Sequence, residues 1–159
     1  MKRIAFVCLG NICRSPMAEA VARAMLDEAG LADEVSVESF GTAGYHVGEP
    51  ADPSTEAALA RRGWPTGGHK ARQVTPADIE RLDLVLCADR ANLADVTALA
   101  GRRADPDRIR LLRSYDPDAG PGAAVPDPWG LDAGGFDRSL EMIERACRGL
   151  VGQLAAGTD

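Results

Sequence analysis

The sequence has few of the residues that metal-binding and disulfide-stabilised proteins depend on. Its 159 residues include two histidines, His46 and His69, and four cysteines, Cys8, Cys13, Cys87 and Cys147. The cysteines do not form Cys-x2-Cys pairs followed by histidines, so a zinc site is not expected. They are also too sparse for the disulfide framework of a small secreted domain. We therefore expect no metal and no structural disulfide.

Long hydrophobic runs are also lacking. The run from Ile4 to Leu9 follows two basic residues, but Asn11 and Arg14 end it too early for a signal peptide. No stretch approaches the roughly 20 apolar residues of a membrane span, so we expect a cytoplasmic protein with no membrane partner. The formal net charge of −6 argues against a nucleic-acid partner, although a local pocket can still be positive.

Aromatic residues make up only 4% of the chain, whereas hydrophobic residues as a whole make up 45%. Ala, Val, Leu and Ile must therefore fill the core. The length suits one domain, residues 1–159, and it is large enough to bury such a core.

Apolar runs alternate along the chain with helical patterns. Ser15 and Pro16 are typical of a helix start, with Ser15 as the N-cap. Gly63 is typical of a helix end. The strongest pattern is the last one, in which apolar residues from Phe136 to Leu154 form one stripe. Strands are expected over residues 3–8, 35–39, 83–88 and 108–112, and helices from Ser15, over 53–63, over 89–99 and from Phe136.

This alternation predicts an α/β fold, with a mostly parallel sheet and helices on both faces. Ligands bind such sheets beyond the carboxyl ends of the strands. Residues 113–135 are rich in Gly, Pro and Asp and are expected to form a long loop, a type of segment that is often functional.

The segment from Cys8 to Arg14 lies between the first strand and the first helix. Backbone N–H groups of such a loop can surround an anion, and the helix N-terminus adds a positive field. Gly10 and Asn11 tolerate the left-handed backbone that this curvature needs. Arg14 offers a planar fork to two phosphate oxygens, and the field favours a nucleophilic thiolate at Cys8.

A bare Cys-x5-Arg spacing also arises by chance, from a buried cysteine and a surface arginine. The preceding strand, Gly10-Asn11 inside the loop and Ser15-Pro16 after it favour the phosphate-binding interpretation. No lysine follows a glycine-rich loop, so a nucleotide-binding P-loop is disfavoured.

The run Val7-Cys-Leu-Gly-Asn-Ile-Cys-Arg-Ser-Pro16 resembles the signature of the low-molecular-weight protein tyrosine phosphatases. The resemblance continues through Ser39–Thr42, Gly68–Gln73, Asp89–Asn92 and Asp127–Trp129. It implies a four-stranded parallel sheet with the phosphate-binding loop after the first strand. It also implies a phospho-cysteine mechanism without a cofactor, acting on a tyrosine-phosphorylated protein or peptide, with inorganic phosphate or other oxyanions also bound in the site.

Such a reaction needs a general acid, and four aspartates precede a proline: Asp52, Asp105, Asp116 and Asp127. Asp-Pro is ordinary turn chemistry. Asp127 is preferred because Trp129 follows it in the long loop and because the family places its acid there. The other three are expected to be turn residues.

The resemblance also assigns supporting roles. Asn11 is expected to be held by Ser39 and His69, and Ser15 to hydrogen-bond the thiolate. Cys13 is expected to form a protective disulfide with the nucleophile under oxidation. The residues expected to bind the substrate are Leu9, Gly10, Asn11, Ile12, Cys13, Tyr45 and Trp129.

Tyr45 and Trp129 match positions that flank the substrate ring, which favours phosphotyrosine over the shorter phosphoserine. Gly130 stands where many family members have a second aromatic residue. Two alternatives share the fold. An arginine phosphatase carries Thr where this chain has Ile12. An arsenate reductase needs two further cysteines about seven residues apart, but Ala94 stands where the partner of Cys87 would be.

Overall fold

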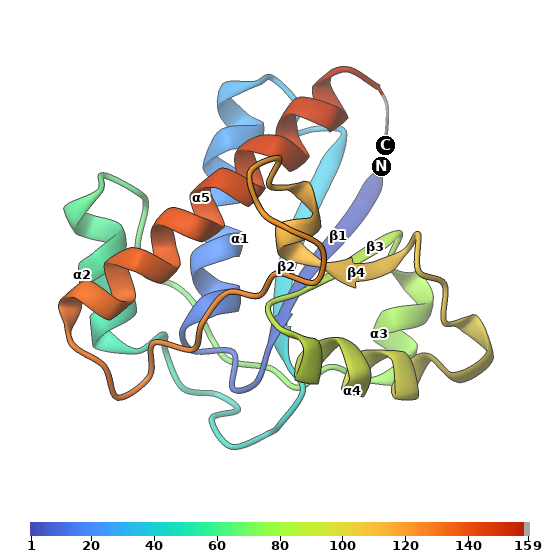
Figure 1. Cartoon of the computed structure of the whole chain (residues 1–159), viewed down its shortest axis with the longest axis horizontal. Helices are drawn as coiled ribbons and strands as arrows, with labels where there is room; N and C mark the ends of the chain where they lie inside the picture. Colours follow the sequence, from blue (N-terminus) through green and yellow to red (C-terminus); the bar gives the residue numbers. More distant parts are fainter. Residues whose placement is uncertain (158–159) are drawn as a thin grey trace.

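The computed structural model describes residues 1–157, which are built around one four-stranded sheet (Figure 1). The strand order is β2-β1-β3-β4, and every neighbouring pair is parallel. The expected four-stranded parallel sheet is therefore confirmed. The strands are β1 (Lys2–Cys8), β2 (Val35–Gly41), β3 (Leu84–Cys87) and β4 (Ile109–Leu111).

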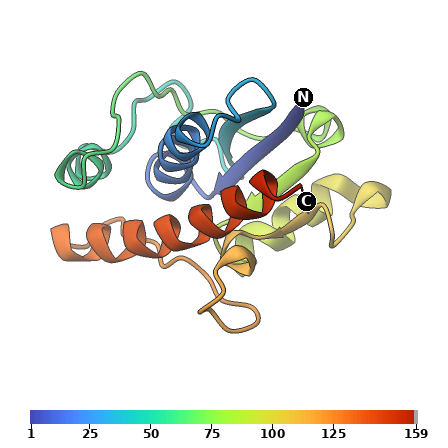
Figure 2. The same ribbon diagram turned by 90° about the horizontal axis from the view of Figure 1, so that it is seen from above.

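Helices connect the strands and cover both faces of the sheet. The α-helices are α1 (Arg14–Glu28), α2 (Pro53–Arg61), α3 (Pro76–Arg81), α4 (Arg90–Ala100) and α5 (Ala133–Ala155). Two short 3-10 helices, η1 (Gly101–Arg103) and η2 (Leu112–Tyr115), flank β4. In Figure 2 the long α5 runs beside α1.

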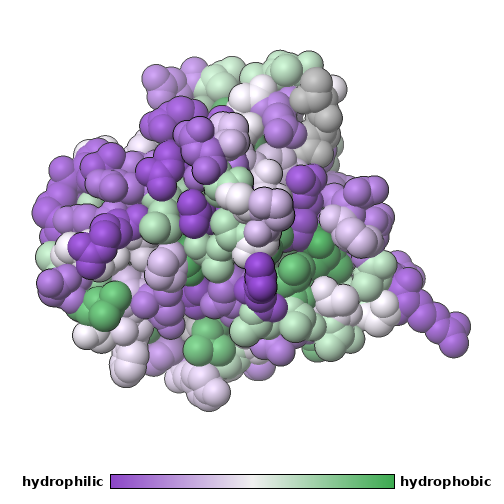
Figure 3. Space-filling model, in the orientation of Figure 1, coloured by the Kyte–Doolittle hydropathy of each residue, from purple (hydrophilic) through white to green (hydrophobic). Residues whose placement is uncertain are grey.

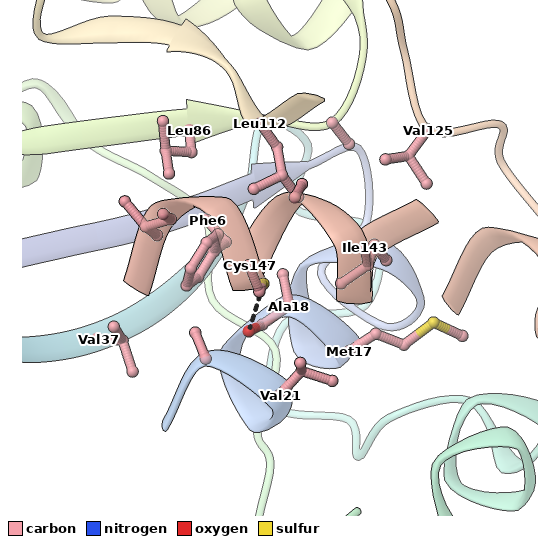
Figure 4. Close-up of a cluster of buried hydrophobic side chains, with 14 of the residues drawn as sticks. Phe6, Met17, Ala18, Val21, Val37, Leu86, Leu112, Val125, Ile143 and Cys147 are labelled. Atoms are coloured by element: carbon pink, nitrogen blue, oxygen red, sulfur yellow. Dashed lines mark hydrogen bonds between the residues drawn. The ribbon is translucent and has the colours of Figure 1, made fainter. Parts of the chain in front are cut away.

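Alternate residues of β1 supply two separate hydrophobic cores, as expected for a strand buried on both faces. Ile4 and Phe6 pack with α1, α2 and α5, whereas Ala5 and Val7 pack with α3 and α4. Figure 4 shows Phe6 beside Cys147 of α5, whose thiol lies 3.8 Å from the carbonyl of Ala18 in α1. The predicted apolar stripe of the last helix faces this core.

The structure departs from the local predictions in three places. Ser15 is not the N-cap of α1: the cap position is Cys13, and the Ser15 side chain lies inside the first turn, turned toward Cys8 and Asn11. The helix α3 was missed, although Thr75 and Asp78 form a reciprocal capping box at its start. The long loop is also shorter than expected, because η2 occupies its beginning and α5 begins at Ala133.

Three segments meet beyond the carboxyl ends of the strands, along the lower edge of Figure 1. They are the loop that follows β1, the loop that follows β2, and the loop that precedes α5. Figure 3 shows separate hydrophobic side chains emerging between hydrophilic ones along this edge. Within residues 1–157, no helix is long and apolar enough to cross a membrane.

A buried carboxylate ties α2 to α5. Arg62 donates two hydrogen bonds to Glu144, at 2.8 and 2.7 Å, and the Trp64 indole donates a third at 2.6 Å. Burial acts to raise the pKa of Glu144, but the hydrogen bonds outweigh it, and the pKa lies below its ordinary value. The ionised form is therefore the one that stabilises the fold.

This lowered pKa gives a pH-dependent contribution to stability. The contribution is complete above the unfolded-state pKa of Glu144 and is lost as the pH falls through the lower folded-state value. We expect Glu144→Gln to lower the free energy of unfolding by about 1 to 2 kcal/mol at pH 7, and by less at acidic pH. Urea denaturation at a series of pH values measures this. Glu141→Gln, at a half-exposed carboxylate 3.8 Å from Arg62, is the control and should change stability by less than about 0.5 kcal/mol. Equal losses in the two variants would contradict the assignment.

Candidate active site

The loop after β1 is held in an unusual backbone conformation at one residue. Asn11 has φ of 59°, the one positive value among the non-glycine residues that the structure describes. This left-handed conformation costs an ordinary side chain about 1 to 2 kcal/mol, but asparagine tolerates it better than most. The turn reverses the chain between the end of β1 and the start of α1.

Four hydrogen bonds hold Asn11, and three of them come from distant parts of the sequence. Its amide nitrogen donates to Ser15 Oγ at 2.8 Å and to Ser39 Oγ at 3.0 Å. Its amide oxygen accepts from the backbone N–H of Arg72 at 2.8 Å, and its carbonyl oxygen lies 2.6 Å from His69 Nε2. The two contacts expected for Asn11, with Ser39 and His69, are both present.

Cys8 is the last residue of β1 and lies at the base of this loop. Its sulfur is 2.9 Å from Ser15 Oγ. The Ser15 hydroxyl also lies 3.3 Å from the carbonyl of Phe40, so its single hydrogen has two alternative acceptors. When Cys8 is a thiol, Ser15 can donate to Phe40; when Cys8 is a thiolate, Ser15 can donate to the sulfur.

Arg14 begins α1 and is buried, with 3% of its side chain exposed. Its Nη1 donates to Asp89 at 2.7 Å and to the carbonyl of Val125 at 3.1 Å. Its Nε is buried and has no hydrogen-bond partner. A buried donor without a partner is costly, and a bound oxyanion would satisfy it. The guanidinium is thus held in place through Nη1, while its Nε remains able to donate a hydrogen bond to an anion.

All four Asp-Pro aspartates make the same local hydrogen bond, to the backbone N–H two residues later. Their surroundings distinguish them. Asp52 caps α2, Asp105 lies exposed in a turn, and Asp116 is buried against Arg113 and Arg145. Asp127 alone of the four lines the pocket that contains Cys8 and Arg14.

Asp127 lies at the mouth of that pocket. Its Oδ2 is 3.8 Å from Arg14 Nη2, and 46% of its side chain is exposed. A half-exposed carboxylate beside the anion site can exchange protons with both a leaving group and water. The Asp127 side chain also accepts a hydrogen bond from the backbone N–H of Trp129, and this Asx turn helps to position the indole.

The pocket has a volume of about 230 Å³. Tyr45 and Trp129, which are 75% and 64% exposed, stand at its rim. Gly130 has φ of 83° in the turn closed by Leu131 N–H and Pro128 C=O, a conformation that suits glycine. The lining residues are Cys8, Leu9, Gly10, Ile12, Cys13, Arg14, Tyr45, His46, Asp127 and Trp129.

Nine of the predicted site residues therefore lie together around the pocket, and the others support it. Asn11, Ser15, Ser39 and His69 hold the loop from behind rather than lining the cavity. Two residues of the site had no predicted role. Asp89 anchors Arg14, and its position just after the buried run 83–88 could have indicated this.

His46 is the other missed residue. Its Nδ1 lies 2.7 Å from Glu49, and its ring covers Gly10 so closely that a Cβ there would come within 3.0 Å of the ring. Gly10 is therefore needed for this approach. The place of His46 directly after Tyr45 was the available signal.

The remaining cysteines differ from Cys8 in their surroundings. Burial raises the pKa of Cys13, Cys87 and Cys147 to about 12. They are protonated at neutral pH and are poor nucleophiles. Among the described residues, no group of three or more His, Cys, Asp or Glu side chains could hold a metal ion.

Comparison with known proteins agrees with this geometry. The family model for low molecular weight phosphotyrosine protein phosphatase matches residues 3–158. The chain belongs to this family. A low molecular weight protein-tyrosine-phosphatase of Streptomyces coelicolor is 50% identical over 150 residues, which cover 94% of this chain and 91% of that protein.

Solved structures of the phosphatase family share the whole fold. A protein tyrosine phosphatase of Entamoeba histolytica, with Hepes in its active site, superimposes with a TM-score of 0.92 at 29% identity and covers all of both chains. The YwlE arginine phosphatase has a TM-score of 0.85 at 29% identity, covering 96% of this chain and 95% of that one. The fold therefore does not by itself separate tyrosine from arginine phosphatases.

Two substitutions distinguish how much the side-chain hydrogen bonds of Asn11 and its left-handed backbone each contribute to stability. Asn11→Gly loses the side-chain bonds but tolerates the backbone conformation. Asn11→Ala loses the same bonds and should pay about 1 kcal/mol more for the left-handed backbone. Chemical denaturation should therefore give stabilities in the order wild type, Asn11→Gly, Asn11→Ala. An alanine variant as stable as the glycine variant would show that the left-handed turn is not retained.

Proposed function

We propose that this member of the family hydrolyses phosphotyrosine on proteins or peptides through a phospho-cysteine at Cys8. One observation carries the proposal: Cys8, Arg14 and Asp127 line a single pocket, and the buried Nε of Arg14 has no partner there. A nucleophile, an anion-binding fork and a proton donor are the groups that phosphate-ester hydrolysis needs.

In the first step, the Cys8 thiolate attacks the phosphorus. A sulfur–phosphorus bond forms and the phosphorus–oxygen bond to the tyrosine breaks, with its electron pair remaining on the phenolic oxygen. Asp127, in its protonated form, gives that oxygen a proton, so the tyrosine leaves neutral. Arg14 and the backbone N–H groups of the loop hold the other phosphate oxygens as negative charge develops on them.

In the second step, water attacks the phospho-cysteine. Asp127, now ionised, takes a proton from the water. The sulfur–phosphorus bond breaks, and its electron pair returns to the sulfur. Ser15, 2.9 Å from that sulfur, can donate a hydrogen bond to the thiolate as it leaves. The products are inorganic phosphate and the regenerated enzyme, so no oxidant, reductant or metal enters the cycle.

The pocket walls favour an aromatic phosphate ester. Tyr45 and Trp129 stand at the rim, where they can flank a phenyl ring. Ile12 also lines the pocket, and its side chain cannot hydrogen-bond a guanidinium, which disfavours phosphoarginine. An arsenate reductase would need a second cysteine about seven residues after Cys87, and Ala94 stands there instead. Cys87 is also fully buried in β3. Both observations disfavour the arsenate-reductase alternative.

Cys13 fits a protective role against oxidation. Peroxide would oxidise Cys8 to a sulfenic acid, and the Cys13 sulfur would then displace water to form the disulfide. Because burial raises the pKa of Cys13 to about 12, this closure should be slow until the loop opens.

The substrate class is tested by comparing phosphotyrosine, phosphoserine and phosphoarginine peptides of otherwise identical sequence. We expect kcat/KM to be highest for phosphotyrosine by at least about 100-fold, because of the three side chains only its phenyl ring can stack on Tyr45 and Trp129 at the rim. Phosphoarginine as the preferred substrate would instead establish the alternative activity.

The role of Asp127 is tested by the leaving group. Phenolic esters such as phosphotyrosine leave poorly and need a proton, whereas nitrophenyl phosphate leaves more easily. We expect Asp127→Asn to lower kcat for phosphotyrosine by roughly 100-fold or more and to lower it less for the activated ester. Vanadate binding should change little.

Asp105→Asn is the matched control, since it removes the same Asp-Pro carboxylate and the same type of turn far from the pocket. Its kinetics should equal those of the wild type. An Asp127 variant that slows both esters equally would remove Asp127 as the general acid.

A further inference from the structure

A chain of hydrogen bonds connects Cys8 to a carboxylate to which no sequence pattern gave a role. Ser15 lies next to the Cys8 sulfur, and Asn11 donates to both Ser15 and Ser39. Ser39 Oγ in turn donates to Oε1 of Glu19, at 2.6 Å. Glu19 lies on α1, one turn beyond Ser15, and 17% of its side chain is exposed. The carboxylate therefore ends a continuous chain that begins at the nucleophile.

The chemistry of these groups gives the chain one direction. An ionised carboxylate can only accept hydrogen bonds, so the single hydrogen of Ser39 is committed to Glu19. Ser39 then faces Asn11 as an acceptor. If the Ser39 hydrogen turned toward Asn11 instead, two donors would face each other across 3.0 Å. Glu19 thus determines which way Ser39 can pair.

The donor and acceptor roles can be followed from Ser39 through Asn11 and Ser15 to the Cys8 sulfur. The amide oxygen of Asn11 is occupied by the Arg72 N–H, so its nitrogen must supply both remaining bonds, to Ser39 and Ser15. Ser15 therefore accepts from Asn11, and its own hydrogen is left for one of two acceptors, the Phe40 carbonyl or the Cys8 sulfur. That hydrogen can then reach the Cys8 sulfur whenever the sulfur is an anion.

We propose that Glu19 is a positioning residue that fixes the Ser39 end of this chain, while the Arg72 N–H orients the Asn11 amide, and that together they keep the Ser15 hydrogen available to the Cys8 thiolate as it leaves. The inference rests on the proposed phospho-cysteine mechanism. Its effect is on the second step, in which the sulfur regains its electron pair, and not on the binding of phosphate. Loop shape has other supports, because His69 and Arg72 hold Asn11 independently of Glu19.

The surroundings of Glu19 are suited to this role. Arg23 donates to its other oxygen, Oε2, at 2.5 Å, which leaves Oε1 for Ser39. Ser39 is buried, with 1% exposed, so water does not readily replace the carboxylate as its acceptor. Glu19 also borders a second pocket, of about 130 Å³, behind the loop, together with His69 and Glu56.

Two substitutions of Glu19 distinguish the effect of losing its hydrogen-bond acceptor from the effect of losing its negative charge. Glu19→Gln keeps an oxygen that can accept from Ser39 but removes the charge, whereas Glu19→Met has similar length and no acceptor. We expect Glu19→Met to lower the steady-state kcat for nitrophenyl phosphate by about threefold to tenfold, the effect of one weakened hydrogen bond. The burst of nitrophenol should persist. The glutamine variant should stay within about twofold of wild type, and inhibition by inorganic phosphate should be unchanged in both.

Glu56→Met is the matched control, because Glu56 borders the same pocket but accepts from the N–H of Gly67, which is not part of the hydrogen-bond chain to Cys8. Its kcat should equal that of the wild type. Equal losses in the Glu19 glutamine and methionine variants would show a charge effect and overturn the proposal, as would a methionine variant with wild-type kcat. A methionine variant with lower thermal stability but unchanged kcat would leave Glu19 a purely structural role.

An activity-independent measurement separates failure of this inference from failure of the proposed function. The side-chain amide protons of Asn11 can be followed by NMR. They should exchange with solvent faster in Glu19→Met than in the wild type or in Glu19→Gln, whether or not the enzyme accepts phosphotyrosine. Unchanged exchange in the methionine variant overturns the inference, whereas a wild-type protein without phosphatase activity overturns only the proposed function.

Discussion

The left-handed turn at Asn11 is the constraint on which the rest of the site depends. It allows the chain to leave β1, reverse, and enter α1 with the Cys8 sulfur and the Arg14 guanidinium lining one cavity. The residues that hold it come from positions up to 61 apart in sequence. The site therefore exists only in the folded protein, since the sheet brings Ser39 and the 69–73 segment to the loop.

An acidic protein can bind an anion because the relevant charge is local. The net charge is −6, yet the buried Arg14 faces the pocket with an unpartnered Nε. Asp89 and the Val125 carbonyl fix its other edge, so the guanidinium needs little reorganisation when an oxyanion binds. The Asp127 carboxylate lies 3.8 Å from Nη2, at the mouth of the same pocket.

Local patterns were sufficient to predict most of the fold and the core of the site. Buried runs and apolar stripes indicated the four strands and α5, and the Cys8–Arg14 spacing indicated the loop that lines the pocket. The same patterns wrongly assigned Ser15 as the N-cap of α1, because serine is typical both of helix caps and of side chains that hydrogen-bond a cysteine. Contacts such as Asn11 with His69 span 58 residues, and no local pattern contains them; only family resemblance indicated them. His46 and Glu19 contact Gly10 and Ser39, which only the fold brings to them, so neither pattern nor spacing revealed them.

The most direct test of the account is whether phosphate becomes covalently attached to Cys8 during turnover. The purified protein would be mixed with a radiolabelled phosphotyrosine peptide, quenched within milliseconds, digested and examined by mass spectrometry. The account predicts one transient phosphate per active site, on the peptide that contains Cys8 and on its sulfur. Steady turnover without any phosphorylated intermediate, or a phosphate carried by another residue, would contradict it.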